Sequence, residues 1–217
     1  MKMSPKADYV PITGIANIPT FFGVKKDSPI RSIKDLTERA KKNPDIVSYA
    51  SGGVGSPQHL ATELYRAYTG VKLLHVPYRG ASQAALALAS GEVELMSIAL
   101  PLAQPYLPDG RVRLIGYCGM ERHPQFRDVP TLHEQGLSKY DYSSWVGLFV
   151  SKDAPREAIN VLRNASKEIV NERGFQVQLI RAGLDPWPKS SDELASITNE
   201  DFLKWQKVIE TSKIQGS

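Results

Sequence analysis

A run of small residues directly precedes Pro57: Ser51, Gly52, Gly53, Val54, Gly55 and Ser56. Glycines let the backbone approach a ligand closely, and serine hydroxyls donate or accept hydrogen bonds. Ser56 and Pro57 are also the residue types that begin a helix, where free N–H groups attract anions. The run therefore predicts an anion-binding loop, although the same residues would equally serve a plain chain turn followed by a helix cap.

A second candidate loop follows Pro77 and consists of Tyr78, Arg79, Gly80, Ala81 and Ser82. Arg79 stands just beyond an apolar run, and a guanidinium in such a place pairs bidentately with a carboxylate. A solvated surface arginine would have the same sequence context. Both readings of Arg79 stay open at this stage.

The sequence lacks the residue patterns of phosphate binding, of a serine nucleophile and of a metal site. The first loop matches neither GxxxxGK[ST] nor GxGxxG, the two phosphate-binding patterns. No GxSxG surrounds a serine, and His59, three residues after Ser56, is interpreted as a structural residue packed against a strand. The histidines and Cys118 show no HxxxH or HExxH spacing. We therefore predict no catalytic centre, no metal and no cofactor.

Apolar runs alternate with helical patterns along the chain. Strands are expected at 20–25, 46–50, 71–76, 93–99, 112–118 and 144–150. Helices are expected after Ser32, Ser56 and Ser82, as one turn at Thr131–Glu134, and at 155–172, 174–182 and 191–214. This alternation predicts an α/β fold with a parallel or mostly parallel sheet covered on both faces. Ligands of such sheets bind beyond the carboxyl ends of the strands, where both candidate loops lie.

Composition narrows the class of protein. The chain has 217 residues, 41% of them hydrophobic and 23% charged, which is typical of a globular protein. Its 27 basic and 23 acidic residues are interspersed, so nucleic acid is not an expected partner. A single cysteine, Cys118, excludes an internal disulfide. The opening residues show no signal-peptide pattern, and by themselves predict a soluble chain that is not exported.

The order of several motifs carries a resemblance. Three motif-bearing runs cover nearly the whole chain: YASGGVGSPQHLATELYRAYTGVKLLHVPYRGASQAALALASGEVELM, then GRVRLIGYCGMERHPQFRDVPTLHEQGL, and finally WVGLFVSKDAPREAINVL. Each motif is weak alone, but in this order the sequence resembles the receptors of tripartite tricarboxylate transporters, which include the Bordetella uptake proteins. The resemblance implies a periplasmic-binding-protein fold of type II, in which two lobes close on a small carboxylate.

The same resemblance implies an organisation and partners. Residues 20–140 would form the second lobe, 1–19 an opening segment of the first lobe, and 141–217 the remainder of the first lobe. Both candidate loops would line the ligand cleft. The expected partners are a small organic carboxylate and the membrane components of the transporter, and the expected role is binding rather than catalysis.

One departure leaves an alternative open. Family members begin with a signal peptide and a proline- and glycine-rich first-lobe loop, whereas this chain enters at ADYVPI, so we expect truncation at the N-terminus. The resemblance implies the periplasm, although no export signal is seen. The alternative is a non-transport relative that binds another protein, or itself, through an incomplete first lobe.

Overall fold

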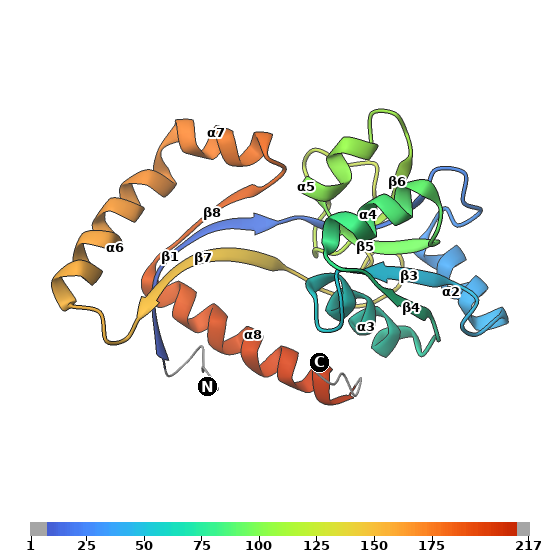
Figure 1. Ribbon diagram of the computed structural model, residues 1–217, viewed down its shortest axis with the longest axis horizontal. Helices are drawn as coiled ribbons and strands as arrows, with labels where there is room; N and C mark the ends of the chain where they lie inside the picture. Colours follow the sequence, from blue (N-terminus) through green and yellow to red (C-terminus); the bar gives the residue numbers. More distant parts are fainter. Residues whose placement is uncertain (1–7, 212–217) are drawn as a thin grey trace. The chain divides into compact units, whose positions relative to one another are not determined.

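The computed structural model describes residues 8–211. These residues divide into two compact units, one made of 8–18 and 145–207 and the other of 19–144 and 208–211 (Figure 1). Strands and helices alternate along the chain, so the predicted α/β class is confirmed. No helix in the described part is long and apolar enough to cross a membrane.

The larger unit is built on a five-stranded sheet in the order β4-β3-β5-β2-β6. Its strands are β2 (Thr20–Lys25), β3 (Ser48–Ser51), β4 (Leu74–Pro77), β5 (Leu95–Ala99) and β6 (Val112–Tyr117). All five were expected, although several begin or end at different residues from those predicted. β3 and β5 are interior strands of this sheet, and their residues are buried almost throughout.

The expected mostly parallel sheet is confirmed in four of its five strands, and β2 is the exception. β3 runs parallel to β4 and β5, but β2 pairs antiparallel with both β5 and β6. The run TFFGVK is buried almost throughout because it lies inside a sheet covered on both faces. A continuous apolar run indicates this burial but does not indicate strand direction.

Helices cover the two faces of this sheet. α4 (Ala81–Ser90) contributes Ala84, Ala85 and Leu88 to a cluster with Met96 and Ile98 of β5. On the other face, α3 (Pro57–Thr69) places the Tyr65 ring 5.2 Å from that of Phe22 in β2. Tyr68, near the end of α3, is 45% exposed. Coverage of both faces, as expected, leaves the strand ends and their loops as the accessible part of the sheet.

Local capping signals are met in detail. Ser32 Oγ accepts the Asp35 N–H at the start of α2 (Ile33–Lys42), and Gly70 ends α3 with a positive φ of 68°. Thr131 and Glu134 make both bonds of a capping box. The residues after Thr131 form a hydrogen-bonded turn, however, so the one-turn helix predicted there is wrong.

Two short helices between β5 and β6 were not anticipated. They are α5 (Leu100–Ala103) and the 3-10 helix η1 (Gln104–Tyr106). Two prolines lie in this stretch, each at the start of one helix, where the missing N–H costs nothing.

The smaller unit has a three-stranded sheet in the order β7-β1-β8, formed by β7 (Ser144–Ser151), β1 (Tyr9–Ile18) and β8 (Asp185–Lys189). β1 and β8 pair antiparallel and were missed by the sequence analysis. Pro11 and Gly14 in β1, and Pro186 and Pro188 in β8, obscured the strand pattern. The pairing of β1 with β8 requires glycine at position 14, because a Cβ there would lie 2.7 Å from Lys189 Cβ and 2.9 Å from the Trp187 ring.

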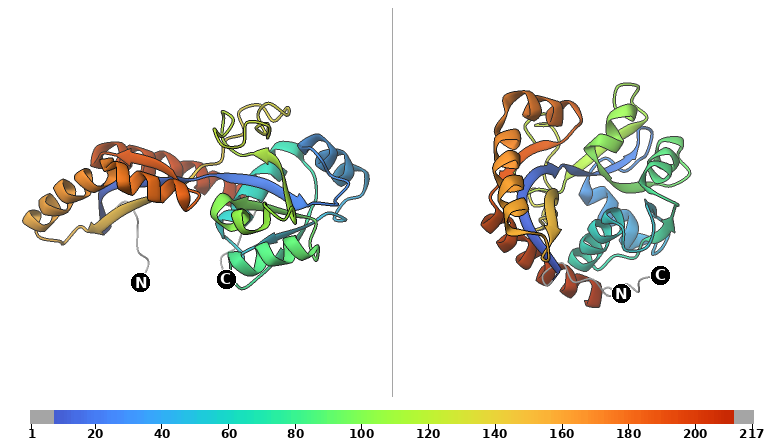
Figure 2. Two further views of the ribbon diagram at one scale, coloured as in Figure 1. Left: turned by 90° about the horizontal axis from the view of Figure 1, so that it is seen from above. Right: turned by 60° about the vertical axis from the view of Figure 1, so that its left-hand side comes forward.

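The three helices of this unit are α6 (Arg156–Asn171), α7 (Arg173–Arg181) and α8 (Ser191–Thr211), of which residues 208–211 are assigned to the larger unit; Figure 2 shows them from two further directions. All three were predicted, and the expected residues of α8 beyond 211 lie outside the described part. Ser190 and Glu193 form a capping box at the start of α8. Trp145 and Trp187 stack at 5.9 Å, which agrees with a packing role for both rings.

Candidate functional site

The two predicted loops meet at one edge of the five-stranded sheet. β3 and β4 are parallel neighbours with Ser51 opposite Pro77, and Tyr78 N–H donates to Ser51 O at 2.9 Å. A Cβ on Gly52 would lie 2.9 Å from Ala81 N, so the loops touch where glycine allows it. The first loop therefore leads into α3 and the second into α4 from adjoining positions.

The two helix starts differ in their hydrogen bonding. Ser56 Oγ accepts the His59 N–H at the start of α3, at 3.4 Å. α4 begins after Gly80, whose φ is 115°, and no side chain caps it. The first-turn N–H groups of α4 thus lack the side-chain acceptor that Ser32 and Ser56 supply for α2 and α3, and the helix dipole adds a partial positive charge there. A carboxylate oxygen is a suitable acceptor for these groups.

The predicted site residues are not equivalent in exposure. Val54, Gly55, Arg79 and Ser82 are exposed, whereas Gly52, Gly53, Ser56, Tyr78, Gly80 and Ala81 are partly buried. Ser51 is fully buried. Its hydroxyl lies 2.6 Å from His75 Nε2 and 3.1 Å from both Gly53 N and Gly53 O. Ser51 therefore shapes the loop from beneath, and an incoming ligand would meet the backbone of its neighbours.

The side chains of the second loop are only partly available. Tyr78 donates its hydroxyl to Glu92 Oε1 at 2.9 Å. Burial and the nearby carboxylate both raise the pKa of this phenol. Arg79 is exposed, and it takes part in none of the ion pairs found among the described residues. It is the cation closest in sequence to the uncapped start of α4.

A buried polar group supports the first loop, and the sequence analysis did not foresee it. Glu63 is 4% exposed and accepts from Tyr49 Oη at 2.8 Å and from Arg66 Nη1 at 2.6 Å. His59 is 7% exposed and accepts the Gly55 N–H on Nδ1 at 3.0 Å. The spacing of His59, Glu63 and Arg66 along one helix was a signal for this group. His59 bonds within the protein, in agreement with its structural interpretation, and the His75 ring likewise contacts Ser51.

The side chains around the two loops offer little support for a catalytic centre. Ser51 and His75 have the separation of a nucleophile and a base, yet Ser51 is fully buried and its oxygen already contacts Gly53. Cys118 is buried, and burial raises the pKa of its thiol well above the ordinary value. Residues 8–211 contain no group of three His, Cys, Asp or Glu side chains able to hold a metal ion.

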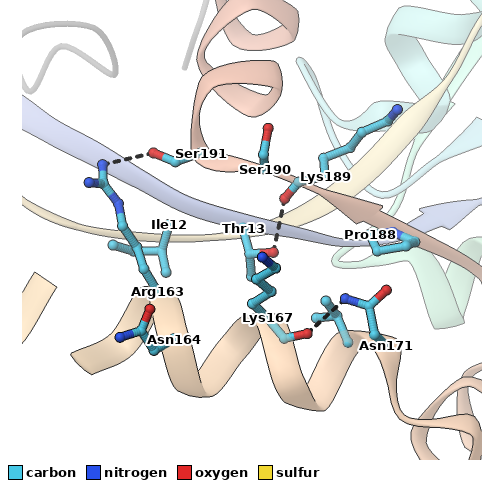
Figure 3. Close-up of a pocket in the computed structure, with 11 residues that line it drawn as sticks. Ile12, Thr13, Arg163, Asn164, Lys167, Asn171, Pro188, Lys189, Ser190 and Ser191 are labelled. Carbon is cyan, nitrogen blue, oxygen red and sulfur yellow. Dashed lines mark hydrogen bonds between the residues drawn. The ribbon is translucent and has the colours of Figure 1, made fainter. Parts of the chain in front are cut away.

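A separate cavity of about 310 Å³ lies in the smaller unit, between α6 and the strands β1 and β8 (Figure 3). Arg163 and Lys167 extend into it from α6. Arg163 Nη2 donates to Ser191 Oγ at 2.8 Å, and Lys189 pairs with Glu193 at 3.1 Å. The Ser190 N–H and hydroxyl also bond Glu193. We take the two loops as the candidate site because the glycine-lined backbone and the uncapped start of α4 meet there, whereas Lys189 and Ser190 at this cavity already bond Glu193.

Comparison with known proteins identifies the family of this chain. The sequence matches the family described as "Tripartite tricarboxylate transporter family receptor" over residues 1–214. The chain belongs to this family. Among curated relatives, a UPF0065 protein from the tcbD-tcbE intergenic region of Pseudomonas sp. strain P51 is 34% identical over 93% of this chain and 60% of its own length. A UPF0065 protein from Cupriavidus necator is 30% identical over 95% of this chain and 62% of its own length.

Solved structures give the receptor fold. R. palustris Rpa4515, determined with adipate, superposes with a TM-score of 0.89 at 29% identity, covering 98% of this chain and 71% of that protein. MatC from Rhodopseudomonas palustris with bound malate superposes with a TM-score of 0.83 over 93% of this chain and 69% of that protein; its identity of 24% shows the fold alone. The chain spans about 60% of the length of the curated relatives named above.

Proposed function

We propose that this receptor captures a small organic carboxylate for a tripartite tricarboxylate-type transporter in the periplasm. The carboxylate would be held by Ser51–Ser56 and Tyr78–Ser82, with the two compact units corresponding to the two lobes of the family fold. The membrane components of the transporter would be its protein partners. The observation that carries this proposal is the uncapped start of α4 beside the glycine loop.

The chemistry of the two loops supports a carboxylate in particular. Backbone N–H groups and a helix dipole favour an anion, and the exposed Arg79 adds a full positive charge. The neighbouring hydroxyls of Ser51 and Ser56 are engaged within the protein, so recognition would rest mainly on N–H donors. The structure of Rpa4515 with adipate, from a relative 29% identical to this chain, supports the same ligand class.

Calorimetric titration with adipate, malate and citrate tests the proposal, with adipamide as the uncharged control. We expect heat of binding for at least one acid and none for the amide. Arg79→Ala should weaken binding by about tenfold, equivalent to one lost charge-assisted hydrogen bond, without changing the melting temperature. Absence of binding by every acid at millimolar concentration would count against the proposal.

A second role, docking of another chain, is favoured by one observation. The smaller unit exposes large apolar side chains, among them Val161 at 66%, Leu203 at 62% and Ile169 at 49%. Such residues commonly mark a surface that another protein covers. Size-exclusion chromatography with light scattering would detect self-association, and Val161→Glu with Leu203→Glu should abolish it. A monomer at all concentrations would argue against this second role.

A further inference from the structure

Two imidazole rings lie face to face beneath the glycine loop. The centroids of His59 in α3 and His75 in β4 are 4.1 Å apart, and their planes differ by 6°. The Tyr49 ring stacks on His75 at 4.7 Å with an interplanar angle of 14°. Three elements of the larger unit therefore meet in one stack of aromatic rings directly under the candidate site.

Each imidazole is tied to the loop by a hydrogen bond. His75 Nε2 lies 2.6 Å from Ser51 Oγ, and that oxygen also contacts the Gly53 N–H at 3.1 Å. His59 Nδ1 accepts the Gly55 N–H at 3.0 Å. Gly53 and Gly55 both have positive φ values, 120° and 77°, so the loop adopts a backbone conformation that needs such fixed points. The two histidines hold it at Ser51 and Gly55.

The groups around the stack keep both rings neutral. Glu63 Oε1 lies 3.7 Å from His59 Nε2, but this oxygen already accepts from Tyr49 and Arg66. Burial lowers the pKa of His59, and it lowers that of His75 to about 4. The Coulomb effect of Glu63 opposes this shift, and that of Arg66 reinforces it. Acceptance of the Gly55 N–H requires His59 Nδ1 to be unprotonated.

We propose that His59 and His75 are positioning residues for carboxylate binding, and that protonation of the pair releases the loop and weakens binding. This inference rests on the proposed function of the loop. A proton on His59 Nδ1 would face the Gly55 N–H donor, and two cations would lie ring against ring. Simple attraction predicts the opposite trend, because an added positive charge below an anion site would strengthen binding at low pH.

Binding measurements on two substitutions of His59 test the inference. His59→Asn keeps a side-chain acceptor near the position of Nδ1 and cannot be protonated, whereas His59→Leu has no acceptor. At pH 7.5 we expect adipate affinity within about threefold of the parent for Asn and a loss of about tenfold for Leu, the value of one hydrogen bond. Between pH 7.5 and 4, the parent should weaken relative to His59→Asn. Adipate itself gains protons over this pH range, but this affects both proteins equally and cancels in the ratio of their affinities.

His133 supplies a matched control. Its Nδ1 also accepts a backbone N–H, that of Lys139 at 3.0 Å, and it lies outside both loops. His133→Leu should leave adipate affinity and its pH dependence unchanged. Equal affinity for His59→Leu and the parent at pH 7.5, or identical pH profiles for His59→Asn and the parent, would overturn the inference.

Amide hydrogen exchange at Gly55 separates this inference from the proposed function, since it needs no ligand. Protection of the Gly55 N–H is expected in the parent and in His59→Asn, and its loss is expected in His59→Leu. If no acid binds the parent, the proposed function fails while the exchange data still decide whether His59 fixes the loop. Unchanged exchange in His59→Leu would reject the positioning role.

Discussion

Gly52 lies so close to Ala81 that a Cβ at position 52 would come within 2.9 Å of the Ala81 nitrogen and 3.3 Å of its Cα. The obstructing atoms are backbone, which cannot rotate away as a side chain would. The approach of the two loops therefore depends on a missing methyl group, and with it the shared position of the starts of α3 and α4.

Gly52→Ala should separate the loops. We expect a loss of stability of about 1–3 kcal/mol from overpacking, together with loss of carboxylate binding. Urea denaturation and calorimetric titration measure the two effects. Gly174→Ala is the control, because a Cβ there meets only Glu172 Oε1 at 3.4 Å and the residue lies in α7. That change should be neutral or stabilising by up to about 1 kcal/mol.

A carboxylate built onto the start of α4 should compete with the ligand. Ser82→Asp places a negative charge in the first turn, which stabilises the helix by about 0.3–1 kcal/mol through the dipole. The melting temperature should rise while adipate affinity falls. Ser90→Asp puts the same charge at the opposite end of α4, where it should lower the melting temperature slightly and leave binding intact. Undiminished binding by Ser82→Asp would place the ligand elsewhere.

Stability should fall on acidification because of His75. Its pKa is lowered from 6.5 to about 4 in the folded protein, mainly by burial, so between these values the unfolded chain binds more protons. The free energy of unfolding therefore decreases as the pH falls from 6.5 towards 4. Partial exposure reduces the full linkage to about 1–2 kcal/mol. Urea denaturation of His75→Phe, which keeps the ring but cannot be protonated, should show a smaller pH dependence over this window.

The Cys118 thiol should be unreactive in the folded protein. It is fully buried, and burial raises its pKa, so almost no thiolate is present or accessible at pH 8. Ellman's reagent should react with one thiol in 6 M guanidinium chloride, a concentration chosen to unfold ordinary domains, and with almost none in buffer. Rapid reaction in buffer would show that the β6 end of the sheet opens readily.

The sequence by itself determined the α/β class, the capping residues Ser32 and Ser56, and the two loops at strand ends. These features depend on local physics: apolar periodicity, the hydrogen-bonding reach of a capping side chain, and glycines with positive φ. The order of the motifs also determined the family. Local patterns failed where prolines and glycines lie inside strands, as at Pro11 and Pro188, because pairing with distant partners overrode them.

Tertiary structure alone decided how these parts meet. The antiparallel direction of β2 follows from its place between β5 and β6, which an apolar run cannot specify. The stack of His59 on His75, and the burial of Ser51 beneath its own loop, bring together residues from β3, α3 and β4. Such contacts arise from the register of separate strands, and neither spacing nor composition along one segment contains that information.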